Sequence, residues 1–177
     1  SEETIVKSLK ECNGELPHFI TLHHFTRRLE NATNDFMDLR NLLTTKNVFS
    51  EFLYNNDFVF TKNDDGSVSG TYKNRNLKNI MDDCDNISNL VNITRLRQRL
   101  FSTDYNQDSC INGFLFGWNF LKDESNYRQD LRLGPEIIRD LGALVGHDLE
   151  TDYKKQSKYY LITLKVDINK CYLMEGI

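Results

Sequence analysis

The chain has 177 residues, of which 39% are hydrophobic and 11% aromatic, and a formal net charge of -4. This size and composition predict a single globular domain over residues 1–177 and exclude an intrinsically disordered chain. The acidic balance disfavours nucleic acid as a partner, and the sequence has no run of about 18 apolar residues that would predict a membrane span.

The N-terminal quarter is predicted to hold a short helix, a strand and a longer helix. Apolar residues at helical spacing over 5–12 precede Pro17, and residues 18–25 carry apolar side chains on both faces, which is typical of an internal strand. From Leu29 to Leu43, apolar residues at spacings of 3 and 4 form one continuous stripe. This stripe predicts a helix, and we expect Thr26 to be its N-cap.

Residues 48–101 are predicted to contain a helical segment, a hairpin and two further helices. Apolar residues over 48–53 predict one or two helical turns, and Asp65-Gly66 between the β-prone runs 58–60 and 68–72 predicts a hairpin. Residues 75–101 carry two apolar stripes that are out of phase. We expect a break between them at 85–89, where Asn, Asp and Ser accumulate.

The last part of the chain adds a strand, a helix and a second strand. An aromatic strand is expected over 113–121 between polar loops at 102–112 and 122–129. A helix is expected from Pro135 to Gly146, followed by an alternating strand over 159–168 and an extended piece over 171–174. Strands and helices do not alternate regularly, so the pattern predicts an α+β fold, mainly an antiparallel sheet with about five or six helices packed on it.

Composition also bears on the cellular context. The chain has 19 Asn and only 2 Ala, which is typical of an AT-rich genome. It contains three N-glycosylation triplets, and chance alone predicts about two. The visible N-terminus has no signal-peptide pattern, so we favour a cytoplasmic location and leave secretion open. The apolar residues near Ile177 are compatible with a chain that continues in a longer protein.

The four cysteines, Cys12, Cys84, Cys110 and Cys171, do not have the spacing of metal ligands. We expect no metal site and no cofactor, and we favour reduced thiols over two disulfides.

One group of candidate catalytic residues lies at the end of the first strand. His23, His24 and Thr26 place imidazole and hydroxyl groups where they could hold a phosphate or a ribose. ADP-ribosyl transfer combines an N-terminal strand His or Arg with a late acidic residue, and Glu175 is the late acid in a suitable place. The structural alternative is that both histidines are buried in the strand and that Thr26 only caps the following helix.

A second group of candidates would bind a partner. Arg95 and Arg99 are one helical turn apart, which predicts that they share an outer helix face and, with Arg27 and Arg28, could bind an anionic partner. The alternative is a solvated face balanced by acids at 82–85. Tyr105 and Tyr127 lie in the polar loops and are further candidate contacts, since Tyr and Arg often anchor interfaces.

These observations favour a protein-interaction or regulatory domain without catalytic activity, with another protein as its partner. The interpretation depends mainly on missing motifs: the sequence has no P-loop, no Gly-rich dinucleotide fingerprint and no G-x-S-x-G nucleophile turn. The alternative is a nucleotide-handling enzyme of ADP-ribosyltransferase-like type that uses a strand His and a late Glu.

Overall fold

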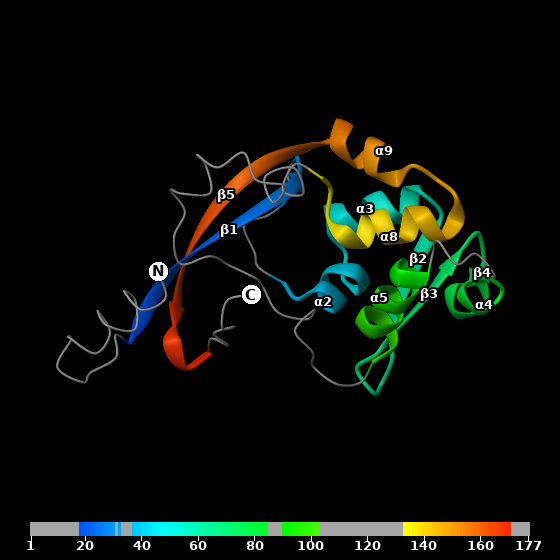
Figure 1. Cartoon of the computed structure of the whole chain (residues 1–177), viewed down its shortest axis with the longest axis horizontal. Coiled ribbons are helices and arrows are strands. Elements are labelled where there is room, and N and C mark those ends of the chain that lie inside the picture. The colour runs from blue at the N-terminus through cyan, green and yellow to red at the C-terminus, as the bar shows by residue number, and fades with distance from the viewer. Residues whose placement is uncertain (1–17, 31, 33–36, 85–89, 103–132, 171–177) are drawn as a thin grey trace.

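Two antiparallel sheets and six α-helices make up the part of the chain that the structure describes, residues 18–30, 32, 37–84, 90–102 and 133–170 (Figure 1). In this computed structural model, 46% of the described residues are helical and 30% are in strands. The predicted α+β class with antiparallel pairing is therefore confirmed. The described strands form two separate sheets, one with two strands and one with three.

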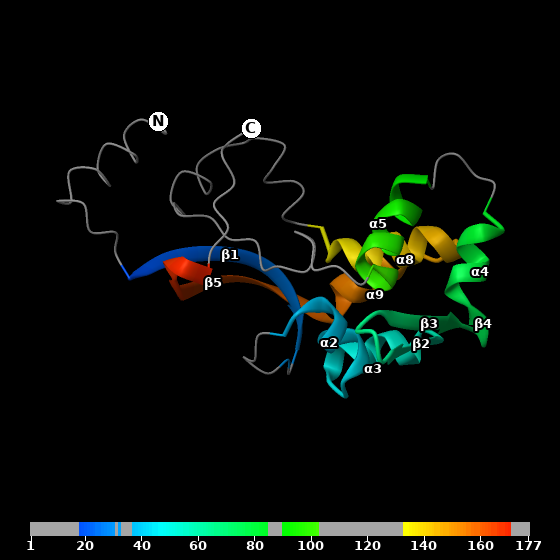
Figure 2. The same ribbon diagram turned by 90° about the horizontal axis from the view of Figure 1, so that it is seen from below.

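The two-stranded sheet is a long ribbon that joins segments far apart in the sequence. Strand β1 (Phe19–Leu29) pairs with β5 (Ser157–Asp167), from Phe19 opposite Asp167 to Leu29 opposite Ser157. Figures 1 and 2 both show this β1–β5 ribbon as a curved arm that extends away from the helices. Its base is buried at Leu29 and Ser157, whereas Phe19 at the far end is 53% exposed.

The other elements form what we call the helical body, residues 37–84, 90–101 and 134–155. Its sheet consists of β2 (Phe58–Lys62), β3 (Val68–Tyr72) and the short β4 (Arg75–Asn76). The predicted hairpin joins β2 and β3. Gly66 has a φ of 83°, a left-handed conformation that glycine adopts without a Cβ clash, and the Asp65 carboxylate accepts from the Ser67 amide beside it.

The described helices of the body are α2 (Leu39–Thr44), α3 (Val48–Asn55), α4 (Leu77–Asp82), α5 (Leu90–Phe101), α8 (Glu136–Val145) and α9 (Leu149–Lys155). A short 3-10 helix, η3 (Ile168–Lys170), follows β5. The prediction of two helices within 75–101 is confirmed by α4 and α5. The helix predicted between Pro135 and Gly146 is confirmed as α8, and Gly146 ends it with a φ of 68°.

The core of the helical body consists of side chains from every described helix and from strands β2 and β3. Those that are completely buried include Leu53, Val68, Leu77, Leu96, Leu100, Ile138, Leu141 and Leu149. Tyr153 of α9 joins this core through edge-to-face contacts with Phe49 and Phe52 of α3, with ring centroids 6.0 and 5.3 Å apart. The half-buried Cys84 packs at its margin.

The prediction of a helix that begins after Thr26 is wrong. Strand β1 continues through Thr26 to Leu29, and the helix starts only at Leu39, where the Asp38 carboxylate accepts from the Asn41 amide as the N-cap. Pairing with β5 extends the strand, because Thr26 lies opposite Tyr160. Helix α9 was not predicted from the sequence. The elements predicted at 5–12, 102–129 and 171–174 lie outside the described residues, apart from Ser102.

Candidate functional site

The structure separates the two histidines that the sequence placed together. His24 and Thr26 are two residues apart in β1, so both lie on the same face of the β1–β5 ribbon. Both also line a groove at the base of the ribbon. His23 is on the other face, where its Nδ1 lies 3.3 Å from the Thr163 hydroxyl. The candidate acid Glu175 lies outside the described residues, as do Tyr105 and Tyr127, so their placement stays a prediction.

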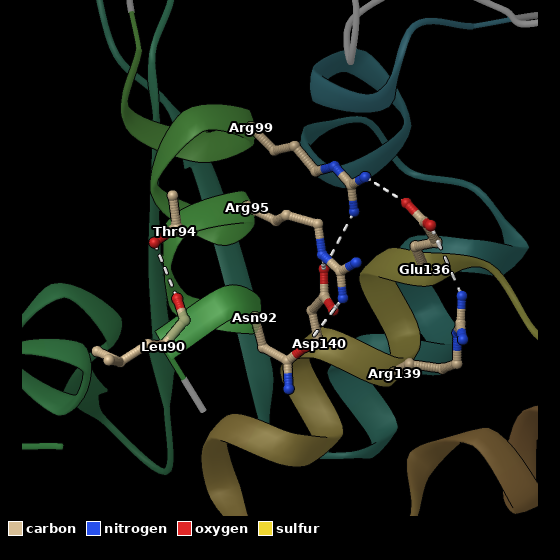
Figure 3. A network of polar contacts seen from close by, with 8 residues as sticks. All are labelled: Leu90, Asn92, Thr94, Arg95, Arg99, Glu136, Arg139 and Asp140. Carbon is tan, nitrogen blue, oxygen red and sulfur yellow. Dashed lines mark hydrogen bonds and ion pairs between the residues drawn. The ribbon is translucent and has the colours of Figure 1, made fainter. Parts of the chain in front are cut away.

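Arg95 and Arg99 do share one face of α5, but the prediction that this face is outer and solvated is wrong. It packs on α8, and Arg99 is only 8% exposed. Figure 3 shows both guanidinium groups pointing toward the acidic side chains of α8. Arg95 donates two hydrogen bonds to Asp140, at 2.6 and 3.2 Å, and Arg99 donates to Asp140 and to Glu136.

Burial sets the electrostatics of this α5–α8 network. Asp140 is completely buried, and burial raises the pKa of its carboxyl group against the opposing effect of the hydrogen bonds and charge of Arg95. Glu136 is half-exposed; burial would raise its pKa as well, but the hydrogen bond and charge of Arg99 outweigh burial and lower it. The network satisfies buried charges between two helices, which is a structural role.

A third arginine, Arg40, is buried at the C-terminal end of α5. Arg40 of α2 is buried and donates to the carbonyl oxygens of Arg99 and Ser102 and to that of Gly66. These contacts join α2, the C-terminal end of α5 and the β2–β3 hairpin. Of the acids near 82–85, Asp82 pairs with Arg97 and Asp83 pairs with Arg75, both at the surface.

A groove of about 570 Å³ lies where the β1–β5 ribbon meets the helical body. We call it the basal groove. Its apolar lining includes Leu29, Leu39, Leu42, Val48, Phe49 and Ile137, together with Ile162 of β5. Its polar lining includes His24, Thr26, Arg27, Arg28, Lys46 and Glu51. An apolar cavity of this volume with a few polar groups at its edge is typical of a binding site.

Tyr153 and Arg27 fix the shape of the basal groove. The Tyr153 hydroxyl donates to the Arg27 carbonyl oxygen at 2.9 Å, and burial raises the pKa of this hydroxyl. The Arg27 guanidinium donates from Nε to the Ser157 hydroxyl at 2.9 Å and from Nη2 to the carbonyl oxygens of Lys154 and Ser157. Arg27 is therefore held in one orientation, and its described acceptors are all neutral groups.

Sequence reasoning found part of this site and missed the rest. His24, Thr26, Arg27 and Arg28 were candidates, but the first two were assigned to catalysis and the last two were grouped with Arg95 and Arg99. Tyr153 and Lys46 were not considered. A local signal for Tyr153 does exist, since Leu149 and Tyr153 are one helical turn apart and both are buried in α9.

Comparison with family models, with curated proteins and with solved structures gives no match for this chain. Within the described ranges, no helix has the length and apolar character needed to cross a membrane. The described residues also contain no group of three or more His, Cys, Asp or Glu side chains that could hold a metal ion.

Proposed function

We propose that this chain is a protein-interaction domain without catalytic activity, and that it binds an apolar segment of a partner protein in the basal groove. The observation that carries this proposal is the groove itself, an apolar cavity between a projecting ribbon and a packed helical body. Its apolar side chains would bury the partner's side chains, and its polar rim would orient the segment.

An exposed tyrosine of the ribbon gives further support. Tyr160 of β5 is 41% exposed and lies two residues from the groove residue Ile162, so both are on the same face of the ribbon. Tyrosine is a frequent anchor in protein interfaces, since it buries a large area with few rotatable bonds. A partner segment that fills the groove would therefore find a second contact surface beside it.

The test compares substitutions on the two faces of β5. Peptides that bind the wild-type chain would be selected from a random library and measured against Ile162→Asp and Leu161→Asp by fluorescence polarisation. Both variants add one negative charge to the same strand, but only Ile162 lines the basal groove. We expect Ile162→Asp to weaken binding at least about tenfold, because it places a carboxylate in an apolar site. Equal affinity for both variants would contradict the proposed site.

A second candidate function is a nucleotide-handling enzyme of ADP-ribosyltransferase-like type. One observation favours it: His24 and Thr26 line the same groove, and Arg27 and Arg28 could attract a phosphate. The test is thermal unfolding with NAD, ATP or cyclic nucleotides. A ligand at 100 times its Kd should add about 2.7 kcal/mol of stability. His24→Ala should abolish that gain, whereas His23→Ala, on the opposite face, should not.

A further inference from the structure

The charges at the basal groove differ from those of the whole chain. The chain has a net charge of -4, yet the groove is lined by three cationic side chains, Arg27, Arg28 and Lys46, and by one described acid, Glu51. Lys46 approaches Glu51 only to 4.0 Å, and both side chains are largely exposed, so this pair has little influence on either charge. Among the described residues, cationic side chains therefore outnumber acidic ones at the groove, although the whole chain is acidic.

The orientation of Arg27 suits it to hold a carboxylate. Its described hydrogen bonds use Nε and Nη2, and their acceptors are a hydroxyl group and two carbonyl oxygens. Nη1 has no hydrogen bond among the described residues, and it is not one of their buried unsatisfied atoms, so solvent can reach it. A guanidinium that is held in place loses little freedom when it binds an anion, and the N–H groups of Nη1 remain to donate to a carboxylate oxygen.

Lys46 provides a second, more mobile cation on the α3 side of the groove. Its side chain is 90% exposed and lies next to Asn47, which caps α3, and Val48, which contributes to the apolar lining. A ligand with both acidic and apolar side chains would therefore match the charge of the rim and the character of the floor at the same time.

We infer that the basal groove binds an acidic segment of a partner protein, in which Asp or Glu side chains flank apolar anchors. This inference rests on the proposed function and specifies the partner's chemistry. The carboxylates would lie against Arg27 and Lys46, and the apolar anchors against Leu39, Leu42 and Val48. Such a pairing requires no chemical step, because it consists of ionic and apolar contacts alone.

The experiment uses three fluorescent peptides of about twelve residues that share Leu and Phe anchors and differ in their charged positions, which are Glu, Gln or Lys. Fluorescence polarisation would measure their binding to the 177-residue chain at low and at high salt. We expect the Glu peptide to bind about tenfold more tightly than the Gln peptide and the Lys peptide to bind more weakly still. The difference should shrink as salt rises, because these charges are at the surface.

A pair of charge reversals links the effect to the groove. Lys46→Glu should weaken binding of the Glu peptide about fivefold and leave the Gln peptide almost unaffected. Lys78→Glu makes the same change in net charge at an exposed position of α4 that does not line the groove. This control should leave the affinity of both peptides unchanged.

The outcomes separate this inference from the proposed function. Equal binding of the Glu and Gln peptides, with both lost in Ile162→Asp, would overturn the acidic partner and leave the protein-binding groove in place. No binding by any of the peptides, including those selected from the library, would contradict the proposed function itself. Tighter binding of a single-stranded oligonucleotide than of the Glu peptide would overturn the inference in favour of a nucleic-acid ligand.

Discussion

The helical body and the β1–β5 ribbon differ in what holds them together. In the body, side chains from all six described helices and from strands β2 and β3 share one apolar core. In the ribbon, Leu29 is the only apolar side chain among those described that is buried. An isolated pair of strands is marginally stable at best in water. The ribbon therefore depends on its base, where the Tyr153 hydroxyl donates to the Arg27 carbonyl oxygen and the Arg27 guanidinium donates to the Lys154 carbonyl oxygen of the body.

This difference suggests a division of roles. The helices of the body pack together through their buried faces, and substitutions on those faces should change the global stability of the chain. The ribbon exposes aromatic and aliphatic side chains and borders the basal groove, and substitutions there should change binding more than stability. The following experiments test that comparison, from the largest expected effect to the smallest.

The largest effect is expected from Asp140→Ala in the helical body. Removal of this completely buried carboxylate deprives both Arg95 and Arg99 of their shared partner, and the loss of stability should be about 3 kcal/mol or more. Urea denaturation would measure the free energy of unfolding, with Asp140→Asn as a milder variant that should still fold. The exposed pair of Arg97 with Asp82 is the control, since Asp82→Ala should cost less than about 1 kcal/mol.

A smaller loss is expected from Gly142→Ala within α8. A Cβ at this position would lie 2.6 Å from the carbonyl oxygen of His147, a backbone atom that cannot move without disturbing the turn into α9. We expect a net loss of about 1–2 kcal/mol in the free energy of unfolding, since the clash outweighs alanine's better helix propensity. A gain in stability would mean that the α8–α9 turn is looser than the structure indicates.

The body was also the easier region to predict from sequence, because its signals are local. The hairpin at Asp65-Gly66 and the helix between Pro135 and Gly146 each depend on residues close together in the chain. The ribbon is different: Thr26 lies opposite Tyr160, and this distant pairing decides that the chain stays extended to Leu29. The helical spacing from Leu29 to Leu43 carries no information about that partner.

Because local sequence signals say nothing about distant partners, the surroundings of Arg95 and Arg99 were also predicted wrongly. Sequence reasoning assigned them acids from the nearby 82–85 segment, whereas their described partners, Glu136 and Asp140, are on α8. One signal could have found them: the two arginines and the two acids are both four residues apart on predicted helices, so two packed helices could align them. The basal groove has no comparable signal, because its lining is drawn from six separate helices and strands.

At the joint between the two regions, Tyr153→Phe should have a moderate effect. The substitution keeps the buried ring and its contacts with Phe49 and Phe52 but removes the hydrogen bond to the Arg27 carbonyl oxygen. We expect a loss of about 1 kcal/mol, together with faster amide hydrogen exchange in β1 and β5 than in α8. Tyr54→Phe, at a 67% exposed site on α3, should change neither measurement. Equal acceleration throughout the chain would show that the ribbon unfolds only with the body.

The smallest effect on stability is expected at the far end of the ribbon, from Phe19→Ala. The Phe19 ring is 53% exposed, and its described contact is the Lys165 ammonium group, 4.6 Å from the ring centroid. An exposed cation–π contact of this kind contributes about 0.5–1 kcal/mol at best, so the free energy of unfolding should fall by no more than about 0.5 kcal/mol once solvation of the ring is included. Chemical denaturation would measure this change beside that of Asp140→Ala. A loss as large as that of the body variant would show that this end of the ribbon is packed in solution, and the ribbon would then have to be treated as part of the core.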